Sequence, residues 1–179
     1  MLKKILIILI VIIIILINLS IIKIDNNKER IYINKPIFIN DNDNSIGYLK
    51  IDKINLNEKL YNINSKENNI EKNITILKES IFPDKENSIV FIAAHSGVGK
   101  IAYFEKLDEL NTNDEVTLII NKKTYKYVVK EYWEEKKNGY INVNKDNKKQ
   151  LILTTCSPNK KNYQLVINCI EKESKWLLF

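Results

Sequence analysis

Six short runs rich in β-branched and apolar residues lie beyond residue 45, and they constrain the fold more than any other feature of the chain. The run TYKYVVKEY at 124–132 alternates aromatic or Val residues with Lys and Glu, as in a strand with one solvated face. The runs at 88–94 and 150–155 are largely apolar, which favours central strands. The others are 46–51, 115–120 and 164–170. We therefore expect a mainly β, mostly antiparallel domain, closed or nearly closed, over residues 45–179.

Helical patterns are sparse in this region. The segment AYFEKLDEL at 102–110 could form two helical turns, and 66–77 could contain one short helix. The link NKKT between 115–120 and 124–132 has the length of a β-hairpin connection, so we expect these two runs to pair.

The N-terminus carries an apolar run from Ile5 to Ile22, interrupted only by Asn18 and Ser20. As a helix, about 18 residues span about 27 Å, close to the thickness of the hydrocarbon core of a bilayer. Two lysines precede the run and place residues 1–4 in the cytoplasm. We expect a single-pass anchor in the cell membrane at 5–22, an extracellular tether at 23–44 and an exported domain. A cleaved signal is the alternative, and it also exports the domain.

The formal net charge is +6, and nearly all basic residues are lysine, with Arg30 the only arginine. Nucleic-acid sites usually combine arginine forks with aromatic residues, so this composition favours a solvated lysine surface and no nucleic-acid partner. A weak attraction to anionic cell-surface polymers or lipid headgroups stays open.

Two cysteines on an exported chain suggest a disulfide. The strand pattern argues against it. If 150–155 and 164–170 pair as a hairpin, Cys169 lies opposite about residue 151, beyond bonding distance of Cys156. We expect Cys169 to be a buried apolar residue and Cys156 to be a free thiol.

Cys156 and the only histidine, His95, each follow an apolar run and precede a polar turn. Strand ends present side chains at the surface of a rigid sheet, where a Cys–His pair can form a thiolate nucleophile and its acid/base partner. Structural roles for both residues stay open on pattern alone. One His and two separated Cys lack the spacing of a zinc site, and no Gly-rich phosphate loop is present, so we expect no metal and no cofactor.

Three segments occur in the order of the sortase family's motifs. The stretch LTTC at 153–156 resembles the family's TLxTC motif. The stretch at 92–116 resembles its histidine segment, with His95 followed by a phrase of the form F..L..L..GD.V. Residues 46–61 resemble its opening strands, with Asp52 in place of a proline. Together these segments resemble a sortase over about residues 45–172.

The resemblance implies an eight-stranded sortase β-barrel and a membrane-anchored cysteine transpeptidase. Such enzymes cleave a sorting signal of LPxTG type through a thioacyl-enzyme and transfer the acyl group to an amine of a cell wall precursor or a pilin lysine. By motif, Cys156 would be the nucleophile, His95 the acid and base, and Thr155 would help to position the substrate. The implied partners are secreted proteins with a C-terminal sorting signal and an amine acceptor.

The sequence departs from the family at the arginine on the strand after the cysteine, where Gln164 stands. A Gln amide can donate a neutral hydrogen bond to an oxyanion but carries no charge. Lys160 or Lys161 could compensate from the preceding loop.

The groove wall in the family corresponds to residues 134–149 here, where Tyr140, Ile141 and Val143 could contact the substrate. Three functions stay open: an active transpeptidase, a catalytically weak or inactive relative that binds surface peptides, and a cysteine peptidase that hydrolyses its substrate.

Overall fold

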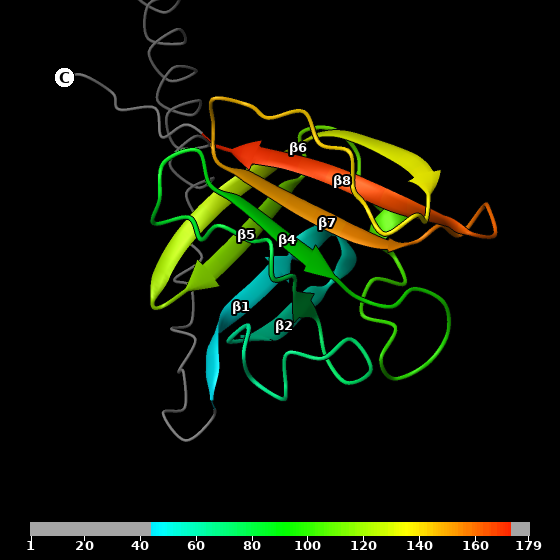
Figure 1. Cartoon of the computed structure of the whole chain (residues 1–179), viewed down its shortest axis with the longest axis horizontal. Coiled ribbons are helices and arrows are strands. Elements are labelled where there is room, and N and C mark those ends of the chain that lie inside the picture. The colour runs from blue at the N-terminus through cyan, green and yellow to red at the C-terminus, as the bar shows by residue number, and fades with distance from the viewer. Residues whose placement is uncertain (1–43, 173–179) are drawn as a thin grey trace, which may run out of the picture. The chain divides into compact units, whose positions relative to one another are not determined.

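The computed structural model describes residues 44–172, which form one eight-stranded sheet. The strand order is β2-β1-β5-β6-β8-β7-β4-β3, and the two end strands lie next to each other, so the sheet is nearly closed into a barrel (Figure 1). The strands are β1 (Ser45–Ile51), β2 (Leu56–Tyr61), β3 (Thr75–Ile76), β4 (Ile89–Ala93), β5 (Glu115–Ile120), β6 (Lys123–Lys136), β7 (Gln150–Cys156) and β8 (Tyr163–Glu171). The mainly β, nearly closed barrel that we expected is confirmed.

The barrel interior is filled by alternate residues of the central strands. Leu151 and Leu153 of β7 and Leu165 and Ile167 of β8 belong to the same buried core. Ile152 and Val166 are also fully buried but do not belong to that core. Because side chains alternate between the two faces of a strand, these two lie on the outer face of the barrel, where they are covered from solvent.

The hairpin between β5 and β6 is confirmed and tighter than expected. The two strands pair up to Ile120 and Lys123, which leaves a turn of Asn121 and Lys122. Both turn residues have positive φ, as type I′ hairpin turns require. At the other edge of β5, Gly47 of β1 lies so close to the carbonyl of Ile119 that a Cβ would be 1.7 Å from its oxygen, so only glycine fits.

Neither expected helix forms. In 66–77 the side chain of Asn68 donates to the carbonyl of Ile76 and accepts from its amide, so polar side chains bond the backbone in place of a helix. In 102–110 only one 3₁₀ turn forms, η2 (Leu107–Glu109). The buried residues of 102–110 are Phe104, Leu107 and Leu110, which recur every third residue, the period of a 3₁₀ helix and not of an α-helix.

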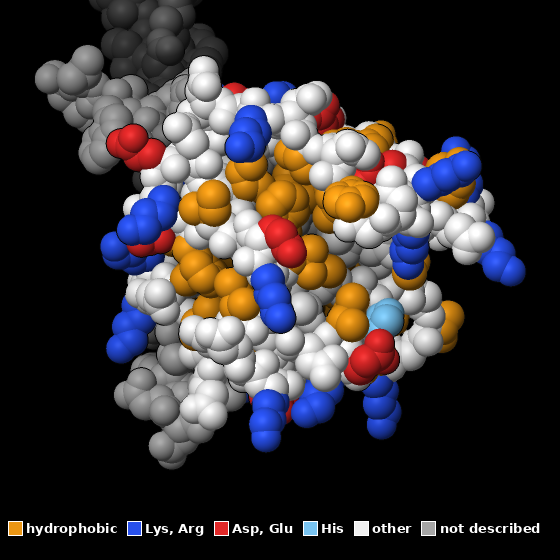
Figure 2. Space-filling model, in the orientation of Figure 1, with side chains coloured by type: hydrophobic (Ala, Val, Ile, Leu, Met, Phe, Trp, Pro, Cys, Tyr) orange, Lys and Arg blue, Asp and Glu red, His pale blue; other side chains and the backbone are white. Residues whose placement is uncertain are grey.

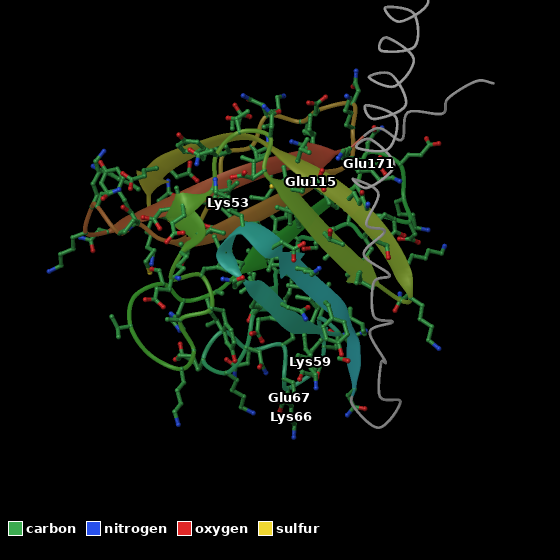
Figure 3. All side chains as sticks on the ribbon, turned by 180° about the vertical axis from the view of Figure 1, so that it is seen from behind. Lys53, Lys59, Lys66, Glu67, Glu115 and Glu171 are labelled. Atoms are coloured by element: carbon green, nitrogen blue, oxygen red, sulfur yellow. The ribbon has the colours of Figure 1, made fainter. Side chains whose placement is uncertain are left out.

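The end of β8 is tied to its neighbours by lysine–carboxylate pairs. Lys172 pairs with Glu115 at the start of β5, and Lys149 pairs with Glu171 at 3.1 Å. Seen from behind, Glu115 and Glu171 lie well apart from Lys59 of β2 and from Lys66 in the loop after it (Figure 3).

The expected anchor at 5–22 lies outside the described residues, as does the tether except for Asn44. Within 44–172, none of the helices has the length and apolar character needed to span a membrane.

Candidate functional site

The strands before His95 and Cys156 are parallel neighbours. β4 pairs with β7 in parallel, with Ala93 opposite Thr154, so His95 and Cys156 follow at the same sheet edge (Figure 1). Side chains join the two exits. The hydroxyl of Thr155 donates to the carbonyl of Ala94 at 2.8 Å, and the hydroxyl of Ser96 donates to the carbonyl of Cys156 at 3.0 Å. The fold thus brings together the candidate nucleophile and the candidate acid/base.

Cys156 lies on the outer face of the barrel. The core residues of β7 are Leu151 and Leu153, so Cys156 has the opposite parity and points away from the interior. It is half-buried and forms no disulfide. Cys169, by contrast, is fully buried opposite Leu151, as the strand pattern predicted, and burial raises the pKa of its thiol.

A row of polar side chains crosses the outer face at the level of Cys156. Cys156 is paired with Gln164 on β8, and Gln164 is paired with Glu135 on β6. Directly paired residues on adjacent strands share a face, so the thiol, the amide and the carboxylate line one surface.

Lys137 is a functional candidate that the sequence analysis missed. Its ammonium Nζ lies 2.8 Å from Cys156 Sγ, and its backbone N–H donates to the carbonyl of Asn162 at 3.0 Å. It follows Glu135 by two positions and therefore shares the outer face with it. Only the register of β6 on β8 reveals this neighbour of the thiol, because nothing in the local sequence distinguishes Lys137 from the other lysines nearby.

The imidazole of His95 is about one-third exposed, and its Nε2 lies 3.4 Å from a carboxylate oxygen of Glu71. Nε2 is shielded from solvent and makes no hydrogen bond of good geometry to the described residues. The backbone carbonyl of His95 accepts from the amide of Phe104, whose ring is in the core. The imidazole is thus held at the surface next to hydrophobic side chains (Figure 2), with Nε2 turned toward Glu71. Glu71 was not predicted, because its loop has no regular pattern.

Gln164 stands beside the thiol as expected, but its amide group is engaged. Nε2 donates to Glu135 Oε1 and to the carbonyl of Tyr140, each at 2.9 Å. These two contacts use both amide hydrogens. Partial burial alone would raise the pKa of Glu135, but hydrogen bonds from Asn142 and Gln164 outweigh it and hold this pKa below its ordinary value.

The segment 137–149 runs back along the sheet from the end of β6 to the start of β7 (Figure 1). It forms a wall beside this row, because the Tyr140 carbonyl and the Asn142 side chain bond Gln164 and Glu135. Gln150 anchors it, since its amide donates to the carbonyl of Asn144 and its oxygen accepts from the amide of Asp146. Near the thiol, Tyr140 is largely exposed and Ile141 is half-buried.

Lys160, one of the two lysines expected to compensate for the missing arginine, points elsewhere. Its Nζ is 3.6 Å from Glu134 and 5.3 Å from the centre of the Tyr163 ring. Glu134 is paired with the core residue Leu165 and so lies on the other face of the sheet from Cys156.

A cysteine and a histidine thus stand at the paired exits of two strands of an eight-stranded barrel, and these are the groups that cysteine acyl transfer requires. The model of the sortase domain matches residues 49–171, so the chain belongs to the sortase family. The coarse expectation of a sortase-type cysteine transpeptidase is thereby supported, whereas the roles of Cys156, His95, Gln164, Thr155, Tyr140 and Ile141 stay predictions.

Solved structures with the same fold include sortases of two classes. Sortase C1 from Streptococcus agalactiae is 26% identical, with a TM-score of 0.64 over 75% of this chain and 71% of that chain. Sortase C from Streptococcus pneumoniae is 23% identical, with a TM-score of 0.64 over 73% and 69%. A lid mutant of sortase A from Corynebacterium diphtheriae is 20% identical, with a TM-score of 0.64 over 74% and 72%. The comparison with curated proteins gave no match.

Proposed function

We propose that this chain is a membrane-anchored sortase that cleaves an LPxTG-type sorting signal and transfers the acyl fragment to an amine. The observation that carries the proposal is the parallel register of β4 and β7, which places His95 and Cys156 at one edge of the sheet. An anchor at 5–22 would hold the catalytic domain outside the cell, where exported substrates and lipid-linked acceptors meet.

The chemistry divides into two steps. In the first, the Cys156 thiolate attacks the carbonyl carbon of the signal's Thr, and the carbonyl π pair moves to oxygen. When this pair returns, the C–N bond breaks, and His95 donates a proton to the leaving amine. In the second step an acceptor amine attacks the thioester, His95 takes its proton, and the thiolate leaves. A thioester protected from water favours amine transfer over hydrolysis.

The outer face beside the thiol offers a site for the signal peptide. The segment 137–149 forms a wall there and presents the largely exposed Tyr140 and the half-buried Ile141. We assign to these two side chains contact with the apolar start of the signal. The Streptococcus pneumoniae structure is described in terms of pilin substrate specificity, which supports a pilin as one class of partner, alongside cell wall precursor.

A catalytically inactive peptide-binding module is the second candidate. It is favoured by the engaged amide of Gln164 and by the lack of arginine after Arg30. In this reading the groove holds a sorting signal without cleaving it.

The test is a transfer assay on the full-length chain in mild detergent, with a labelled LPxTG-type peptide and an oligoglycine amine. We expect an amine-linked product from wild type and none from Cys156→Ala. Peptide binding without product in both proteins would support the binding module. Hydrolysis of the peptide at the same rate with and without added amine would identify a peptidase.

A further inference from the structure

Resting on the proposed function, we infer that Lys137 is a catalytic residue that supplies the positive charge of this site. Its ammonium lies 2.8 Å from Cys156 Sγ, the closest contact that the structure shows for the reacting atom. The role goes beyond the motifs of the family, because Lys137 lies just after the end of β6 and not on the strand that follows the cysteine.

Three features of the backbone hold Lys137 in this position. β6 extends to Lys136, and the next amide continues its pairing with a hydrogen bond to Asn162 at 3.0 Å. Lys137 shares the face of Glu135, which is paired with Gln164, which is in turn paired with Cys156. The lysine therefore reaches the sulfur across the start of β8.

Three neighbouring side chains are already engaged elsewhere. Lys160 contacts Glu134 on the opposite face. The carboxylate of Glu135 accepts hydrogen bonds from the side chains of Asn142 and Gln164. Gln164 uses both amide hydrogens on Glu135 and Tyr140. Lys137, by contrast, is in direct contact with the sulfur.

The charge serves both stages of the first chemical step. Before attack, an ammonium at this distance stabilises the thiolate. As the C–S bond forms, the negative charge passes from sulfur to the former carbonyl oxygen. That oxygen is bound to the carbon attached to Sγ, so it lies within reach of the flexible lysine stem. One cation can therefore balance the charge at both positions.

The first test measures the thiol without requiring turnover. Full-length wild type and its variants are alkylated at Cys156 with anionic iodoacetate and with neutral iodoacetamide, with Cys156→Ala as the blank. A nearby ammonium attracts the anionic reagent, so the iodoacetate-to-iodoacetamide rate ratio should fall about 3- to 10-fold in Lys137→Met and persist in Lys137→Arg. Lys136→Met is the matched control, since this exposed neighbour is paired with Tyr163 and has the opposite parity.

The second test measures peptide transfer by the same proteins. We expect Lys137→Met to lower kcat/KM about 10- to 100-fold, Lys137→Arg to retain most activity, and Lys136→Met to match wild type. An unchanged reagent ratio in Lys137→Met would overturn the inference, as would transfer by that variant equal to that of an active wild type. If wild type transfers nothing while the ratio falls in Lys137→Met, the pairing of lysine and thiol stands and the proposed function fails.

Discussion

The hydroxyl of Thr155 donates a 2.8 Å hydrogen bond to the carbonyl oxygen of Ala94. These residues immediately precede Cys156 and His95, so one hydrogen bond joins the two exits that carry the candidate nucleophile and acid/base. Thr155 is buried and has the parity of the core residues of β7. By motif, Thr155 was expected to help position the substrate. In the structure its side chain faces the barrel interior, whereas Cys156 faces outward. Thr155 would therefore affect catalysis by fixing the relative positions of the two strand ends.

Replacement of Thr155 by Val keeps the shape and removes this bond. We expect the free energy of unfolding to fall by about 1 kcal/mol, because the carbonyl of Ala94 loses its partner. We expect the transfer rate to fall about tenfold, because the distance between imidazole and thiol is no longer fixed. Thr155→Ser should restore both. Denaturant unfolding and the transfer assay measure these effects, and normal activity in Thr155→Val would show that this contact does not position the pair.

Gln164 tests whether a neutral amide acts at the oxyanion. If it does, Gln164→Ala lowers kcat by about tenfold, and Gln164→Arg retains or raises it, because a charged donor replaces a neutral one. Steady-state kinetics on the three proteins give the answer. Equal kcat values for wild type and Gln164→Ala would show that Gln164 does not act at the oxyanion and serves only to bind Glu135 and the segment after it.

The depressed pKa of Glu135 predicts how acid affects the groove wall. The ionised carboxylate accepts from the backbone and side chain of Asn142 and from Gln164. Its contribution is therefore fully present above the ordinary carboxyl pKa and is lost as the pH falls through the lower folded-state value.

Hydrogen-exchange protection factors of residues 138–144 measure this effect. They should be constant from neutral pH to about pH 5 and then decrease. Glu135→Gln should show reduced protection already at neutral pH, whereas Glu105→Gln, at an exposed position, should not. Equal protection in Glu135→Gln and wild type would show that this carboxylate does not hold the wall.

Tyr140 and Tyr132 are both largely exposed, but they lie on different faces of the sheet, since Tyr132 is paired with the core residue Ile167. If Tyr140 contacts the signal peptide, Tyr140→Ala should raise KM about 5- to 10-fold with a smaller effect on kcat, because apolar contact area is lost. Tyr132→Ala is the matched control and should leave KM unchanged. Comparable KM values in the two variants would remove Tyr140 from the substrate site.

Much of the barrel could be predicted from local pattern. The alternation in 124–132 and the apolar runs located the long strands, and hairpin geometry placed Cys169 opposite Leu151. The two short helices were wrong because tertiary contacts override weak propensity. Asn68 bonds the backbone of its own loop, and the three-residue spacing of Phe104, Leu107 and Leu110 suits a 3₁₀ turn.

The candidate site was less accessible to sequence reasoning. His95 and Cys156 could be recognised as strand ends, but their closeness depends on the parallel pairing of β4 with β7, which composition does not encode. Lys137 and Glu71 contact the pair through strand register and loop path, and neither leaves a local pattern. Gln164 is paired with Cys156, but its contacts with Glu135 and Tyr140 depend on the path of the segment after β6, which the sequence pattern does not show.

The central claim is that Cys156 and His95 act together in acyl transfer, and intact-protein mass spectrometry tests it most directly. The full-length chain is mixed with an LPxTG-type peptide in the absence of an amine, and the protein mass is followed. We predict a mass gain equal to the acyl fragment on Cys156, its loss on addition of oligoglycine, no gain in Cys156→Ala and strongly slowed gain in His95→Ala. An unmodified mass in wild type under conditions where the peptide binds, or the same gain in Cys156→Ala, would contradict the account.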